Sequence, residues 1–258
     1  MSSVAWRLER YDSVDSTNDL VLARAAAGEP EGLAVLAAEQ RRGRGRHGRS
    51  WASPPGNLYL TLLLRPRKPA QELASLSLVV GLALRQAVAA ATHGAMAVRL
   101  KWPNDLLVGG QKLAGILLEL AATPGDRPAV AAGIGLNIRT CPQLPDRQAV
   151  ALAHFLSSPP PAEELARRTL ACFEPLYARW HEQGFAPLRD AWLAAAHGLG
   201  EEVRLRLGDR QVAGVFLGID DAGRLLLATE AGPELFDAGE LFFPGAPAAP
   251  LVRSGDPR

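Results

Sequence analysis

Arginines and glycines alternate in residues 43–49, which read GRGRHGR. Glycine allows a backbone to fold closely round a ligand, and the planar guanidinium group binds anions through several donors. We therefore expect Arg44, Arg46 and Arg49 to surround an anionic ligand such as a nucleotide phosphate. Because like charges repel, this loop should be mobile until the anion arrives. A solvated basic loop, or an RNA-binding segment, is the alternative.

The glycines of this loop also match the GxGxxG pattern of dinucleotide-binding folds, at Gly43, Gly45 and Gly48. In that motif a helix opens at the third glycine, so that its N-terminus meets a pyrophosphate. Here residues 51–56 read WASPPG, and two prolines and a glycine prevent a helix from forming. The sequence therefore argues against a Rossmann-type site.

Lys101 and Lys112 are two of the three lysines in the chain, and they lie in one short region. An ammonium group is a compact charge that can follow a reacting carboxylate, whereas a guanidinium prefers a fixed bidentate partner. The pattern therefore indicates a chemical need for a lysine. Between the two, Asp105 could hold Mg2+ and Asn104 could bind a base edge. An ordinary turn carboxylate is the alternative for Asp105.

Two further stretches could contact a ligand. Gly133 and Gly135 interrupt an apolar strand, which indicates either a close approach to the backbone or a bulge. Residues 15–18 read DSTN, a good helix N-terminus whose amides and hydroxyls could bind a polar ligand group. Taken alone, that segment is equally a simple helix cap.

Hydrophobic periodicity and turn residues predict the elements that carry these motifs. Helices are expected at residues 17–27, 69–92, 162–181 and 185–196, and strands at residues 33–38, 57–64, 98–102, 106–108, 113–120 and 129–138. The paired glycines 109 and 110 predict a tight hairpin. After residue 198 the pattern changes to short alternating strands, which predicts a small barrel. We expect domains at residues 1–198 and 199–244, and a disordered Pro- and Ala-rich tail at residues 245–258.

Composition excludes several classes of protein. The 28 Lys and Arg balance 27 Asp and Glu, so no general attraction to nucleic acid or an anionic membrane is expected. The apolar run at residues 73–84 is too short to span a bilayer, and the N-terminus lacks a signal-peptide core. Cys141 and Cys172 form no CxxC pattern, which favours the cytoplasm. The five histidines show no metal-ligand spacing, so we expect no zinc, and we expect no flavin.

Taken together and in this order, the motifs resemble those of biotin protein ligases. That family shares a DSTN segment, a GRGRxGRxW loop, KWPNDL, KLAGIL and a GxGxN strand, all of which this sequence contains between residues 15 and 137. The resemblance implies an α+β fold: a class II synthetase-like catalytic domain, with a mixed β-sheet flanked by helices, and a small C-terminal SH3-like β-barrel. It also implies that the enzyme uses ATP and Mg2+ to convert biotin into biotinyl-5'-AMP. Biotin then passes to a lysine of a biotin carboxyl carrier protein.

The resemblance also implies roles for individual residues. Those matching biotin contacts are Ser16, Thr17, Asn18, Gln40, Gly43, Arg44, Gly45, Arg46, Lys112, Gly115, Gly133 and Gly135. Those matching ATP contacts are Arg46, Arg49, Trp51, Asn104, Lys112 and Asn137. Asp105 matches a metal-associated carboxylate. Lys112, Arg46 and Arg49 would carry the catalysis, by bringing two anions together and stabilising the transition state.

Alternatives and partners follow from the same comparison. Lipoate or octanoate ligases and transferases share the catalytic fold, and the transferases use a cysteine, for which Cys141 is the candidate. The arginine loop and the KWPND segment together favour biotin. The first motif begins at Asp15, so we expect no N-terminal DNA-binding domain and no specific DNA binding. We expect no membrane contact, and either a monomer or a homodimer.

Overall fold

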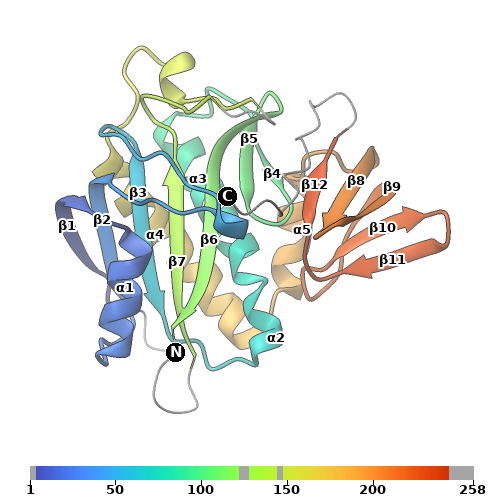
Figure 1. Ribbon diagram of the computed structural model, residues 1–258, viewed down its shortest axis with the longest axis horizontal. Helices are drawn as coiled ribbons and strands as arrows, with labels where there is room; N and C mark the ends of the chain where they lie inside the picture. The colour runs from blue at the N-terminus through green and yellow to red at the C-terminus, as the bar shows by residue number, and fades with distance from the viewer. Residues whose placement is uncertain (1–3, 122–127, 144–147, 244–258) are drawn as a thin grey trace, which may run out of the picture.

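The computed structural model describes residues 4–121, 128–143 and 148–243. Its main feature is a seven-stranded mixed sheet in the order β1-β2-β3-β7-β6-β5-β4 (Figure 1). The strands are β1 Arg7–Val14, β2 Leu33–Gln40, β3 Leu58–Leu64, β4 Val98–Lys101, β5 Asp105–Val108, β6 Gln111–Ala121 and β7 Ala129–Leu136. β1 runs parallel to β2, and the other neighbours are antiparallel.

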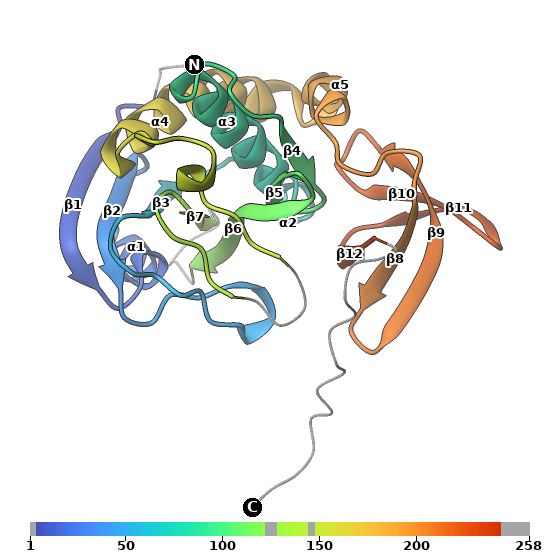
Figure 2. The same cartoon turned by 90° about the horizontal axis from the view of Figure 1, so that it is seen from above.

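Helices cover both faces of this sheet. They are α1 Thr17–Ala26, α2 Ala70–Leu73, α3 Leu76–Ala91, α4 Ala162–Gln183 and α5 Ala186–Ala194. α1 packs on one face, and α3 and α4 lie on the other (Figure 2). All seven residues of β3 are buried because both faces of that strand are covered. The mixed sheet with flanking helices confirms the predicted fold class.

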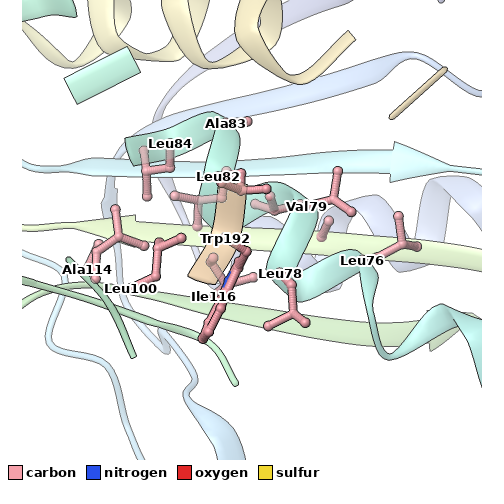
Figure 3. Packing of buried hydrophobic residues seen from close by; sticks show 14 of the residues in the cluster. Leu76, Leu78, Val79, Leu82, Ala83, Leu84, Leu100, Ala114, Ile116 and Trp192 are labelled. Carbon is pink, nitrogen blue, oxygen red and sulfur yellow. The ribbon is translucent and has the colours of Figure 1, made fainter. Parts of the chain in front are cut away.

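The long apolar segment around α3 forms the centre of the core. Leu78 and Leu82 of α3 pack with Leu100, Ile116 and Trp192 (Figure 3). Residues Ala70–Ala91 are the one described stretch long and apolar enough to cross a membrane, but 72% of its apolar 18-residue segment is buried inside the fold. Its hydrophobicity is therefore explained by packing against the sheet and α4.

The prediction of one continuous helix over residues 69–92 is wrong. The helix breaks between α2 and α3, where Ser75 Oγ donates to the carbonyl of Glu72 at 2.6 Å and accepts from Trp180 Nε1 at 2.9 Å. A serine that bonds to nearby backbone competes with the helical pattern, and a buried tryptophan holds it in place. The helix propensities of residues 69–92 do not reveal that Trp180, which is distant in sequence, binds Ser75.

The C-terminal part forms a second sheet beside the first (Figure 2). Its strands are β8 Glu202–Leu207, β9 Arg210–Ile219, β10 Leu225–Thr229, β11 Gly232–Phe236 and β12 Glu240–Phe242, in the order β11-β10-β9-β8-β12. Among the described residues β11 and β12 are the two edges, so the expected barrel is an open antiparallel sheet. The boundary at residues 198 and 199 stays a proposal. The predicted tail at residues 245–258 lies outside the described residues.

The two sheets are joined by specific contacts as well as by apolar packing. Trp102, which is buried at the end of β4, donates from Nε1 to the carbonyl of Gly223 at 3.0 Å. Gly223 has φ +81°, and a Cβ there would lie 2.7 Å from Leu78 Cδ1 of α3. A glycine is therefore required at this turn by both its conformation and its surroundings. These contacts fix the second sheet next to the KWPND segment.

Candidate active site

The arginine loop, defined here as residues 41–56, connects β2 to β3. Its own backbone closes it: Gly45 N donates to the carbonyl of Arg49 at 2.7 Å, and Trp51 N donates to that of Gly43 at 2.9 Å. A short 3-10 turn spans Arg46–Gly48. No helix begins at Gly48, which confirms the rejection of a dinucleotide-binding motif.

The chain's own acceptors bind the arginines of this loop. Arg44 pairs with Asp19 at 2.6 Å and with Glu119 at 2.9 Å. Arg49 pairs with both carboxylate oxygens of Glu240, at 3.0 and 2.6 Å. The expectation of a loop kept mobile by repulsion therefore overlooked these carboxylates. They lie 25, 75 and 191 residues away in sequence, respectively, from the arginines they bind.

Arg46 lies deeper than its two neighbours. It donates to Asn104 Oδ1 at 3.1 Å and to the carbonyl of Gly239 at 3.2 Å, so it spans the two sheets. Burial lowers the pKa of Arg46, while the charges of Asp105 and Glu240 act in the opposite direction. The guanidinium stays charged because its ordinary pKa is so high. Because both of these acceptors of Arg46 are neutral, this partly buried cation can attract an anionic ligand.

Lys112 and Asp105 form an ion pair across the hairpin between β5 and β6. Lys112 Nζ donates to Asp105 Oδ1 at 2.6 Å, and the two side chains are only 13% and 7% exposed. The same ammonium lies 5.3 Å from the ring centroid of Trp51, within cation–π range. The sequence placed these three residues in one site, and the structure brings them together.

Three glycines on two neighbouring strands leave a surface without side chains beside Lys112. We call these residues, Gly115, Gly133 and Gly135, the glycine floor. Gly115 of β6 lies directly opposite Gly135 of β7. A Cβ at Gly135 would meet the indole of Trp51 at 2.6 to 2.8 Å, and one at Gly115 would lie 3.1 Å from the same indole. A Cβ at Gly133 would collide with the amide of Asn18. The close approach predicted for this strand is thus made by side chains of the protein itself.

Polar side chains at the start of α1 face this floor. Ser16 caps the helix by accepting from Asp19 N at 3.3 Å, as its sequence position predicts. Thr17 donates from its backbone N and from Oγ1 to Gln40 Oε1, at 2.9 and 3.0 Å. Asn18 Nδ2 donates to Glu119 Oε2 at 2.7 Å. Ser16, Thr17 and Asn18 are all buried.

The two predicted nucleotide-site asparagines are both bound to the backbone. Asn104 Nδ2 donates to the carbonyl of Ile116 at 2.8 Å, while its Oδ1 receives Arg46. Asn137 Nδ2 donates to the carbonyl of Val150 at 3.1 Å. In this state Asn104 therefore lies within the cluster of charges, and Asn137 instead ties residue 150 to the end of β7.

Asp105 is the residue that the sequence predicts as a metal ligand. Among residues 4–121, 128–143 and 148–243, no group of three or more His, Cys, Asp or Glu side chains could hold a metal ion. Asp105 is the carboxylate beside Lys112. Mg2+ commonly binds one or two carboxylates, with phosphate and water oxygens as its other ligands. Asp105 is thus compatible with an ion brought by a nucleotide, and its role as a metal ligand stays a prediction.

The chain is similar to known proteins in both sequence and structure. Residues 11–137 match the model of the Biotin/lipoate A/B protein ligase family, and residues 198–243 match the Biotin protein ligase C terminal domain. A biotin--[acetyl-CoA-carboxylase] ligase of Paracoccus denitrificans is 42% identical over 242 residues, which cover 90% of this chain and 98% of that relative.

Two solved structures extend this similarity. A biotin protein ligase of Aquifex aeolicus, in complex with biotin and ATP, superposes with a TM-score of 0.80 at 30% identity and covers 92% of this chain and 97% of its own. A biotin protein ligase of Leishmania major, in complex with biotinyl-5-AMP, gives a TM-score of 0.63 at 29% identity, with 90% and 99% covered.

Proposed function

The chain belongs to the biotin/lipoate A/B protein ligase family and is an ATP-dependent biotin protein ligase, and we propose that its reaction takes place between the arginine loop, the glycine floor and Lys112. In the first step the biotin carboxylate attacks the α-phosphate of ATP, giving biotinyl-5'-AMP and pyrophosphate. In the second step a lysine amine attacks the acyl carbon, which releases AMP and leaves an amide. The convergence of Lys112 and Trp51 on the glycine floor, with Arg46 bound to Asn104 next to the Lys112–Asp105 pair, supports the proposal.

We propose that biotin lies at the edge of the glycine floor, against the indole of Trp51, which covers Gly115 and Gly135. Thr17, Asn18 and Gln40 supply both donors and acceptors, which suits the ureido group of biotin, because that group carries N–H and C=O on one small ring. The floor of Gly115 and Gly135 is flat and apolar beneath the indole of Trp51. Since Trp51 touches the floor, we assign it to biotin rather than to adenosine, in contrast to the role implied by the sequence resemblance.

Lys112 is placed to reduce the repulsion between the two reacting anions. An ammonium group has three N–H donors, and Asp105 accepts one of them. The remaining donors can bind the biotin carboxylate and then the oxygens of the phosphorus that it attacks. Charge stabilisation of this kind is usually a large contribution to catalysis, because the positive group is already in position before the reaction. Asp105 keeps it there.

Arg46, Arg49, Asn104 and Asn137 are the proposed ATP contacts. Arg49 is bound to Glu240 here, so a phosphate must replace that carboxylate or share the arginine with it. Mg2+ would enter as the MgATP substrate, and its role is to neutralise phosphate charge. Asp105 is the carboxylate placed to meet the ion. The arginine loop would then cover the adenylate and exclude water until the acceptor lysine arrives.

The acceptor is a lysine of a biotin carboxyl carrier domain in our proposal, because the relative from Paracoccus denitrificans is named as a ligase for acetyl-CoA carboxylase. We place the reaction in the cytoplasm. Cys141 and Cys172, its two cysteines, are both free thiols, as expected in a reducing compartment.

The proposal is tested by biotin transfer in a purified system. The ligase, ATP, Mg2+ and a purified biotin carboxyl carrier domain are incubated with labelled biotin, and the label on the carrier is measured. We expect transfer that requires ATP and that stops when the acceptor lysine of the carrier is replaced by arginine. Faster transfer of lipoate or octanoate to a lipoyl domain would instead assign the chain to the other branch of its family.

A further inference from the structure

Glu119 lies between the proposed biotin site and the arginine loop, and we propose that it is a positioning residue for the ligase reaction. Its carboxylate orients the amide of Asn18 and also binds Arg44. The position of the arginine loop therefore depends on a residue that also orients the proposed biotin site. This inference rests on the proposed function, since it assigns to Asn18 a contact with biotin. Glu119 itself touches neither substrate in this proposal.

The geometry around Glu119 joins two segments that are distant in sequence. Its Oε2 accepts from Asn18 Nδ2 at 2.7 Å, and its two oxygens accept from Arg44 Nη2 at 3.0 and 2.9 Å. Arg44 Nη1 reaches Asp19 at 2.6 Å, in the first turn of α1. One carboxylate on β6 therefore connects the start of α1 to the arginine loop.

The carboxylate of Glu119 at 2.7 Å and the carbonyl of Leu117 at 3.4 Å, which both accept from Asn18 Nδ2, set which way the Asn18 amide points. An ionised carboxylate only accepts hydrogen bonds, so the atom of Asn18 that faces it must be the NH2 group. On the other side the hydroxyl of Thr61 donates to Asn18 Oδ1 at 2.7 Å, and Thr61 is fully buried. The amide also packs directly over Gly133. Asn18 thus offers one fixed pattern of donor and acceptor to the pocket.

A neutral amide at position 119 would remove both effects. Glutamine has the shape of glutamate, but it can donate as well as accept, so the orientation of the Asn18 amide would depend only on Thr61 and on the longer contact to the carbonyl of Leu117. Hydrogen bonds to charged groups are also about twice as strong as neutral ones. Arg44 would keep its bond to Asp19, which is 46% exposed, but lose the partner that links it to Asn18. We therefore expect weaker biotin binding and earlier loss of the adenylate.

The test measures substrate dependence and adenylate retention in the full-length protein. Biotin-dependent exchange of labelled pyrophosphate into ATP gives the KM values for biotin and ATP. Gel filtration after incubation gives the fraction of adenylate retained. For Glu119→Gln we expect the KM for biotin to rise about tenfold or more, with the KM for ATP within about twofold, and the adenylate to leave faster. Glu174→Gln, a change on α4 away from the site, is the matched control.

Two further variants separate positioning from simple folding. Glu119→Asp keeps the charge and should recover part of the affinity for biotin. Adding Glu119→Gln to Arg44→Gln should speed adenylate release by a smaller factor than Glu119→Gln does in the unaltered protein, because the contact between the two residues is already lost. An unchanged KM for biotin in Glu119→Gln would overturn the inference, as would parallel rises in both KM values with a lowered melting temperature. No exchange by the unaltered protein would count against the proposed function itself.

Discussion

Lys112 Nζ lies 2.6 Å from Oδ1 of Asp105, and this ion pair sets the position of the ammonium group at the end of the glycine floor. Both side chains are mostly buried, so separating them would leave an uncompensated charge in a region of low dielectric constant. The pair therefore explains why the chain uses a lysine here, among so many arginines. A single compact charge can serve an internal carboxylate and a substrate at once.

The role of Asp105 can be tested against its alternative as a metal ligand. For Asp105→Asn we expect a lower kcat for adenylate formation, because Lys112 loses the charge that holds it, and a lower melting temperature. Asp209→Asn, in an exposed turn of the second sheet, is the control. Exchange rates should be measured over a range of Mg2+ concentrations. Recovery of the variant at high Mg2+ would show that Asp105 binds the ion and does not chiefly anchor Lys112.

Because Arg49 is bound to Glu240 of the second sheet, we expect that carboxylate and the phosphates of ATP to compete for the Arg49 guanidinium. Glu240 also binds Arg206 at 2.6 Å, so its carboxylate is shared by two guanidinium groups. For Glu240→Gln we expect the KM for ATP to fall about threefold or more, since Arg49 becomes available to phosphate, while the melting temperature falls. Glu202→Gln on β8 provides the control. A rise in the KM for ATP would mean that Glu240 holds Arg49 in its working position.

The glycine floor gives a pair of opposite predictions. In Gly135→Ala the new methyl group would strike the indole of Trp51, which must then move. We expect a higher KM for biotin and altered tryptophan fluorescence. In Gly81→Ala, within α3, the methyl would sit 3.5 Å from Leu100 Cδ2 in ordinary contact, so that variant should be more stable by about 0.5–1 kcal/mol. Normal biotin binding by Gly135→Ala would contradict the proposed floor.

The lowered pKa of His47 should make the free energy of unfolding depend on pH. Burial lowers the pKa of His47, and the charges of Arg46 and Arg49 lower it further. The unfolded chain therefore takes up this proton more readily than the folded one, so the contribution of His47 to stability falls as pH drops below about 6.5. His47→Asn should reduce the loss of melting temperature between about pH 7.5 and 5.5. The control is His93→Asn, which has a similar positive φ. Equal losses in both variants and the unaltered protein would refute this account.

The sequence predicted the chemistry of the site better than its internal contacts. Helix capping by Ser16, the hairpin at Gly109 and Gly110, and strands β2 to β7 of the central sheet follow from local patterns, and the structure confirms them. Lys112 and Trp51 were predicted to share one site from their motifs, and the structure brings the ammonium to 5.3 Å from the ring centroid, while their roles stay predictions. The helix cap, the hairpin and the strands were predictable because each depends on residues close in sequence.

Strand β1 and two carboxylate partners of the arginine loop were not predicted from the sequence. β1 was missed because an edge strand with charges on both faces shows no clear alternation. The carboxylates Glu119 and Glu240 were missed for a different reason: nothing in their local sequence marks them as partners of the arginine loop. A bound anion, and not a carboxylate of the protein, was predicted from the sequence as the partner of these arginines. Only the folded chain shows that carboxylates already occupy those arginines.

The central claim is that Lys112 brings two negatively charged substrates together. The most direct measurement is biotin-dependent exchange of labelled pyrophosphate into ATP by the unaltered protein and by Lys112→Ala, with Lys68→Ala as the control. We expect exchange only when biotin is present, a loss of about 10²- to 10³-fold in Lys112→Ala, and no change in Lys68→Ala. Exchange by Lys112→Ala at the rate of the unaltered protein would contradict the account.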